Sequence, residues 1–134
     1  FWTFVKHRKA GKYWMMHAYA PETKQILAYV YGNRSRKTVQ KLYDKLKMYE
    51  IQMFCTDNWR AFQEVFPKEK HLIGKQYTRE IEGVHTSLRA KNRRFVRKTT
   101  CFSKDFAMHD CITKIVIYLR NCEQENKLLK LTKN

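Results

Sequence analysis

The chain is poor in acidic residues and has no long apolar stretch, and each absence excludes a class of protein. It carries 12 Asp and Glu against 28 Lys and Arg, which gives a formal net charge of +16. No apolar run approaches the roughly 20 residues that a bilayer-spanning helix needs, and no secretory signal peptide opens the sequence. We therefore expect a soluble, intracellular protein whose partner is an acidic polymer, with nucleic acid as the first choice.

The cysteines give no sign of a metal or redox site. Among the four there is no C-x-x-C pair, and their spacing with the five histidines fits no common structural zinc site. Cys55 lies in an extended segment, and Cys111 and Cys122 lie in a helical run, so we interpret them as buried, reduced thiols. No Ser, Cys or Lys has the sequence context of a covalent nucleophile.

Hydrophobic patterning predicts an α/β domain with one mixed five-stranded sheet. Three early segments rich in aromatic and β-branched residues predict an antiparallel meander. Two later segments follow helices, and such strands most often return parallel to a sheet neighbour. The predicted strands are 2–6, 13–20, 25–31, 51–56 and 70–73. The predicted helices are one capped by Ser35 that runs through Leu46, and then 59–66, 78–92 and 103–121. The final residues, 123–134, read as a frayed tail.

Two acids are placed as in enzymes that transfer nucleotidyl groups with divalent metals. Asp57 closes the predicted strand 51–56, at the carboxyl end where open α/β sheets bind ligands. Glu82 lies on the predicted helix 78–92, beside the stripe that would face the core. Hard cations such as Mg²⁺ or Mn²⁺ take oxygen ligands, so two carboxylates, water and substrate phosphate oxygens would form the shell. Two such ions can assist a displacement at phosphorus without a nucleophilic side chain.

Each acid also has an ordinary structural interpretation. Asp57 can cap the helix 59–66 by accepting backbone N–H bonds, a role compatible with metal binding. Glu82 can belong to a plain polar helix face together with His85 and Arg89. In the functional interpretation, His85 and Arg89 instead hold the Glu82 side chain and contact phosphate.

Between Arg89 and Lys98, from the last turn of the predicted helix 78–92 onward, basic residues form a dense run that would suit a phosphate backbone. The candidate DNA-binding residues are His85, Arg89, Lys91, Arg93, Arg94, Arg97 and Lys98. The alternative for this run is a solvated basic helix end and loop. Arg34, Arg36 and Lys37 open the first predicted helix as a further basic group. We assign the aromatics of the first three strands to the sheet core or edge, and leave open whether Trp59 contacts a ligand.

Several motifs occur in a characteristic order. Among them are Cys-Thr-Asp-Asn-Trp at 55–59, Glu-Lys-His-Leu-Ile-Gly-Lys at 69–75, Ile-Glu at 81–82 and Arg-Lys-Thr-Thr-Cys-Phe-Ser-Lys at 97–104. Together they resemble the transposases of the insertion-sequence-one family, over about residues 1–121. The resemblance implies a ribonuclease-H-like fold with a DDE triad, in which Asp57 is the second Asp and Glu82 the Glu. It also makes Arg89 the basic residue two helical turns after the Glu, whereas His85 stands where the family pattern has Asn.

The same resemblance implies that part of the catalytic unit precedes this sequence. In the family the first Asp of the triad belongs to the opening strand, two residues before the position of Phe1, and a DNA-binding region comes earlier still. We therefore expect a catalytic domain at 1–122 with a truncated first strand, a tail at 123–134, and little or no activity in the chain by itself.

The hypothesis from the sequence is a DDE transposase domain that cleaves transposon ends and joins the freed 3′-hydroxyl to target DNA. Its expected partner is double-stranded DNA, its cofactor Mg²⁺ or Mn²⁺, its location the bacterial cytoplasm at the nucleoid, and its active form a homo-oligomer. A metal-dependent nuclease of the same fold and a non-enzymatic basic DNA-binding module are the alternatives.

Overall fold

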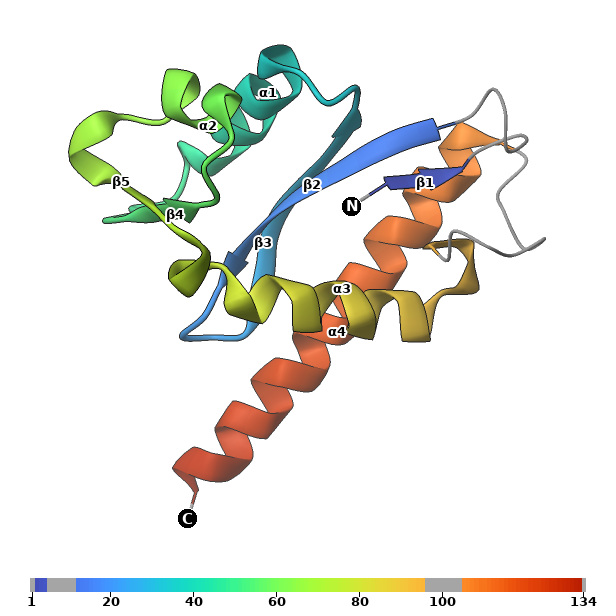
Figure 1. Cartoon of the computed structure of the whole chain (residues 1–134). Coiled ribbons are helices and arrows are strands. Elements are labelled where there is room, and N and C mark those ends of the chain that lie inside the picture. Colours follow the sequence, from blue (N-terminus) through green and yellow to red (C-terminus); the bar gives the residue numbers. More distant parts are fainter. Residues whose placement is uncertain (1, 5–11, 96–104, 134) are drawn as a thin grey trace.

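Strands and helices follow one another in the predicted order (Figure 1). The structure is a computed structural model that describes residues 2–4, 12–95 and 105–133. The strands are β1 (Trp2–Phe4), β2 (Lys12–Ala20), β3 (Gln25–Gly32), β4 (Phe54–Thr56) and β5 (His71–Ile73). The helices are α1 (Arg36–Leu46), α2 (Arg60–Val65), α3 (Arg79–Lys91) and α4 (Phe106–Thr132). Three short 3₁₀ turns lie at Lys68–Lys70, Lys75–Tyr77 and Arg93–Phe95.

The first three strands form the predicted antiparallel meander, with one bulge that sets which side chains face which layer. Ala18 of β2 lies opposite Ala28 of β3. The next pair is Tyr19 with Ile26, so Leu27 is an extra residue on β3. Because of this extra residue, Leu27 and Ala28 both pack towards α1, while Ile26 belongs to the core on the opposite face.

The two faces of the meander are covered by different helices. On one face, Val30 of β3 packs with three buried residues of α1, Val39, Leu42 and Leu46, and the cluster continues to Phe66 beyond α2. These α1 positions follow the helical repeat that predicted the helix, so the amphipathic pattern of the sequence accounts for this layer.

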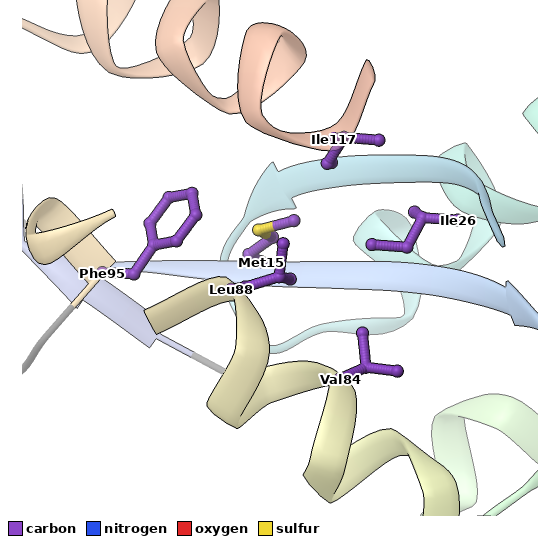
Figure 2. Packing of buried hydrophobic residues seen from close by; sticks show 6 residues of the cluster. All are labelled: Met15, Ile26, Val84, Leu88, Phe95 and Ile117. Atoms are coloured by element: carbon purple, nitrogen blue, oxygen red, sulfur yellow. The ribbon is translucent and has the colours of Figure 1, made fainter. Parts of the chain in front are cut away.

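The other face is covered by α3 and α4 (Figure 2). Its buried cluster consists of Met15, Ile26, Val84, Leu88, Phe95 and Ile117. Leu88 and Phe95 are completely shielded from solvent. The packing fixes α3 against β2, and this determines which way the polar side of α3 faces.

The predicted ribonuclease-H-like, five-stranded mixed sheet is wrong. In the described residues, β4 and β5 form a separate two-stranded parallel sheet, with Phe54 opposite His71 and Thr56 opposite Ile73. The prediction assumed that a strand reached through a helix returns to the sheet on which that helix packs. Here β4 and β5 are short and pair with each other, while residues of β2 and β4 line a cleft instead of a common ladder.

The last helix continues past its predicted end at Asn121 and reaches Thr132, so the residues expected to be frayed are helical. The polar stretch 123–127 interrupts the apolar repeat on which the prediction depended. In Figure 1 the C-terminal part of α4 extends beyond the other elements. The division into a domain at 1–122 and a tail at 123–134 stays a prediction. Within the described residues, no helix is long and apolar enough to cross a bilayer.

The predicted burial of the cysteines is wrong for the three that the structure describes. Cys55 and Cys111 are exposed and Cys122 is half-buried, all three as free thiols. Cys55 lies in β4 between Phe54 and Thr56, and Cys111 lies about half a helical turn away from the buried His109 of α4, so neither side chain enters the core. Cys101 lies outside the described residues.

Candidate functional site

A cleft of about 940 Å³ brings together residues of β2, α1, β4 and α3. Asp57, Glu82 and His85, three of the predicted site residues, line it. The two acids come from different elements, and the cleft is the feature they share. The structure therefore places Asp57 and Glu82 on one concave surface.

Asp57 follows directly after β4, and its side chain is exposed. The backbone N–H of Trp59 donates to Asp57 Oδ1 at 3.1 Å. The N-cap of α2 is Trp59 itself, so Asp57 supports the turn before the helix and is not its cap. Among the described residues, Asp57 Oδ2 has no hydrogen-bond donor. One carboxylate oxygen is thus fixed while the other is available to a ligand.

Glu82 lies in the first turn of α3, where the helix dipole favours negative charge. The same turn carries Glu80, which receives hydrogen bonds from Lys24 Nζ at 3.0 Å and from the Tyr19 hydroxyl at 3.1 Å. The hydrogen bond from Lys24 lowers the pKa of Glu80. Within the described part of the chain, the Glu82 carboxylate makes no such bond. Of the two acids in this turn, only Glu82 opens into the cleft and is left for another role.

His85 lies one turn after Glu82 and packs against His17 of β2. The two rings meet edge to face, with their centroids 5.1 Å apart. Burial, and secondarily the neighbouring His85, lower the pKa of His17 to about 3, so His17 is neutral at pH 7. His85 therefore helps join α3 to β2, in addition to lining the cleft.

The predicted basic run does not line the cleft within the described residues. Arg89 is half-buried on α3. Lys91 forms an ion pair with Glu123 of α4, at 2.5 Å between Nζ and Oε2. Arg93 is exposed and Arg94 is half-buried, both in the 3₁₀ turn at the end of α3. Arg97 and Lys98 lie outside the described residues, so their placement stays a prediction.

Arg34 is a cleft residue that the sequence did not single out. Its guanidinium carbon lies 5.4 Å from the ring centroid of Trp14 and 5.0 Å from that of Trp59. The sequence indicates only that Arg34 belongs to the basic group at the start of the first predicted helix and that Trp14 is one of the sheet aromatics. No spacing rule connects three residues so far apart in the chain, and the position of Trp59 beside Asp57 was the only signal.

The donor chemistry at the two acids suits a hard cation, although the protein offers few ligands. Carboxylate oxygens are the groups that Mg²⁺ and Mn²⁺ prefer. Among the described residues, however, no group of three or more His, Cys, Asp and Glu side chains could hold a metal ion. A cation held by Asp57 and Glu82 would therefore complete its shell with water or with oxygens of the substrate.

Comparison with known proteins gives one consistent result. A family model described as IS1 transposase matches residues 1–123. The insertion element iso-IS1n protein InsB of Shigella dysenteriae is 38% identical over 109 residues, which cover 81% of this chain and 82% of that protein. The IS1 protein InsB of Shigella flexneri is 31% identical with the same coverage. The IS1 4 protein InsB of Escherichia coli K12 is also 31% identical, over 81% of this chain and 65% of its own length. No solved structure matches.

Proposed function

Because this chain belongs to the IS1 transposase family, we propose that it is the catalytic part of a DDE transposase, whose cleft binds DNA and whose Asp57 and Glu82 hold the catalytic metal ions. The reaction would be cleavage at transposon ends followed by joining of the freed 3′-hydroxyl to target DNA. One observation carries the proposal: two exposed carboxylates line one cleft of a protein whose net charge is +16.

The chemistry requires two kinds of contact, and the chain offers candidates for both. Bound Mg²⁺ or Mn²⁺ would activate the attacking oxygen and stabilise the leaving oxygen at phosphorus. Asp57 would contribute the oxygen that the Trp59 amide leaves open, and Glu82 would contribute a carboxylate from the start of α3. The basic residues would hold the phosphate backbone without reading its sequence. They are His85, Arg89, Lys91, Arg93, Arg94, Arg97 and Lys98.

Double-stranded DNA is the proposed partner, and we propose that more than one copy of the chain acts in the assembled complex. The charge of the chain supports the first part, since phosphate neutralisation supplies most non-specific affinity for DNA. An exposed apolar face on α4, which includes Ile115, Tyr118 and Leu119, supports the second.

Two neighbouring acids on α3 provide a matched test. Glu82→Gln removes a proposed ligand, whereas Glu80→Gln removes an acid of the same turn that does not line the cleft. Mn²⁺ affinity of the chain, measured by calorimetry or paramagnetic resonance, should fall at least about 10-fold in Glu82→Gln, since even the loss of a group that only supports a ligand has that effect, and should stay unchanged in Glu80→Gln. In a complete transposase, Glu82→Gln should likewise reduce DNA cleavage while Glu80→Gln leaves it unchanged, and both variants should still bind DNA.

The reaction products distinguish a transposase from a metal-dependent nuclease. Labelled 3′-hydroxyl ends joined to a second duplex are expected from a transposase, whereas cleavage without joining would indicate a metal-dependent nuclease. Equal metal affinity and equal cleavage in the two variants would contradict the proposed site and leave a non-enzymatic DNA-binding module.

A further inference from the structure

The cleft contains one cation that is positioned by aromatic rings and has no acidic partner among the described residues. We propose that Arg34, held by Trp14 and Trp59, binds a phosphodiester group of DNA next to Asp57. This inference rests on the proposed function, because it assumes that the cleft takes nucleic acid, and it assigns a substrate contact that neither the motifs nor the family match provides.

Trp59 connects Arg34 to the acid. Its ring lies under the Arg34 guanidinium, with 5.0 Å between the guanidinium carbon and the ring centroid. Its backbone N–H donates to Asp57 Oδ1 at 3.1 Å. A single residue therefore sets the positions of both the cation and the carboxylate. Trp14 of β2 fixes Arg34 from a second element, at 5.4 Å.

The charge of Arg34 is available, unlike the charges of Arg36 and Arg60. Arg36 and Arg60 both approach Glu64, at 3.9 Å and 2.8 Å. Among the described residues no carboxylate lies within ion-pair distance of Arg34, although the residue is exposed and lines the cleft. Contact with the ring faces leaves the N–H groups at the edge of the guanidinium free. That edge matches the oxygens of a phosphate in a two-point hydrogen bond.

A phosphodiester is the anion that fits both ends of this arrangement. One of its non-bridging oxygens can accept hydrogen bonds from the Arg34 edge while the other approaches a metal ion at the acids, since substrate phosphate oxygens commonly complete such a metal shell. The net charge of +16 favours a polyanion over a free phosphate ion. The ring contacts restrict the Arg34 side chain before the ligand arrives, so less conformational entropy is lost on binding.

Three substitutions test the assignment on the full chain. Arg34→Gln removes both the charge and the planar guanidinium with its paired N–H donors. Arg34→Lys keeps the charge but loses the planar guanidinium. Arg36→Gln removes an equal charge two residues away, outside the cleft lining. Both sites are exposed, so the fold should persist in all three variants, which circular dichroism can check. Affinity for a labelled duplex, followed by fluorescence anisotropy, should fall about tenfold or more in Arg34→Gln. Arg34→Lys should fall between Arg34→Gln and the parent, and Arg36→Gln should change affinity by less than about threefold.

The competing outcomes are distinct. Equal affinity in Arg34→Gln and Arg36→Gln, with DNA binding retained, would overturn the Arg34 assignment and leave the proposed metal site intact. If Arg34→Lys bound the duplex with the same affinity as the parent, the two-point hydrogen bond from a guanidinium held by the tryptophan rings would be overturned. If inorganic phosphate displaced the labelled duplex at concentrations similar to that of the duplex, the site would be one for free anions, and the assignment to nucleic acid would be overturned. Failure of the parent chain to bind any duplex would overturn the proposed function as well.

Discussion

Two histidines that burial keeps neutral make the stability of this fold depend on pH. Burial, with a smaller contribution from Arg94, lowers the pKa of His109 to about 4, while burial and His85 lower that of His17 to about 3. Both values lie below the ordinary value of 6.5, so an unfolded chain takes up protons that the folded chain refuses. Between pH 6.5 and 4, therefore, the free energy of unfolding should fall as the pH falls. Each histidine contributes at most about 1.4 kcal/mol per pH unit, and neither contributes above pH 6.5.

Urea unfolding at several pH values between 4.5 and 7.5 measures how steeply the free energy of unfolding changes with pH. This slope should be smaller in His109→Gln, because the buried side chain at that position then no longer titrates. The comparison uses slopes because the substitution also removes ring contacts with Tyr31 and Phe95 and lowers stability at every pH. A variant with the same slope as the parent would show that His109 does not control acid stability.

At the level of single residues, the sequence could locate the acids of the cleft but not the arginine. Asp57 and Glu82 follow local rules, one at a strand end and one on the rim of an amphipathic helix, and both line the same cleft. The contact of Arg34 with Trp14 and Trp59 depends on how α1, β2 and the turn before α2 pack together. Local patterns contain no information on such packing. Whether the two acids bind metal stays a prediction.

Helix α4 is attached to the meander by the side-chain amide of Asn121, which pairs with the backbone N–H and carbonyl of one β3 residue as a neighbouring strand would. The Ile26 N–H donates to Asn121 Oδ1 at 2.9 Å, and Asn121 Nδ2 donates to the Ile26 carbonyl at 2.9 Å. Arg120 Nη1 adds a hydrogen bond of 2.6 Å to the carbonyl of Lys24. These bonds hold the helix at the end of β3 beside the bulge.

Asn121→Ala should destabilise the protein by about 1 to 3 kcal/mol, since it leaves two part-buried backbone groups without their partner. Asn126→Ala is the matched control, because Asn126 is an exposed asparagine of the same helix. It should change the free energy of unfolding by less than about 0.5 kcal/mol. Chemical denaturation of both variants measures the difference, and equal losses would mean that the Asn121 bonds contribute nothing specific.

Helices and strands could be predicted where the hydrophobic repeat is continuous. The sequence did not predict which strand β4 pairs with, or where a helix ends within a polar stretch. The repeat in α1 and the alternation in the meander gave the right structures in the right order. The last turns of α4 were missed because residues 123–127 are polar. Sheet membership of β4 was missed because a strand of three residues pairs with whichever edge lies nearest, and here that edge is β5.

At the scale of the whole molecule, a strong positive charge is combined with an apolar face on α4, a helix that carries little net charge. The sequence of α4 contains four basic and three acidic residues, a net of +1 in a chain of +16. Its outer face exposes Ile115 by 52%, Tyr118 by 68% and Leu119 by 55%. Large apolar side chains grouped in this way commonly mark an interface. Two copies of so basic a protein would repel each other over most of their surfaces, and this face minimises that repulsion.

Self-association through α4 should therefore depend on Leu119 and not on exposed apolar residues elsewhere. Leu119→Lys places a charge within the apolar face, so the dimer dissociation constant should rise about tenfold or more, because burying a leucine contributes roughly 1.5 to 3 kcal/mol. Met48→Lys makes the same kind of change at a residue that is 80% exposed after α1, so it should leave association unchanged. Sedimentation equilibrium over a range of concentrations measures both constants. If the parent chain remains monomeric at every concentration, or if both variants weaken it equally, the α4 face is not the contact between copies, and oligomers of the active complex must form through the DNA or another surface.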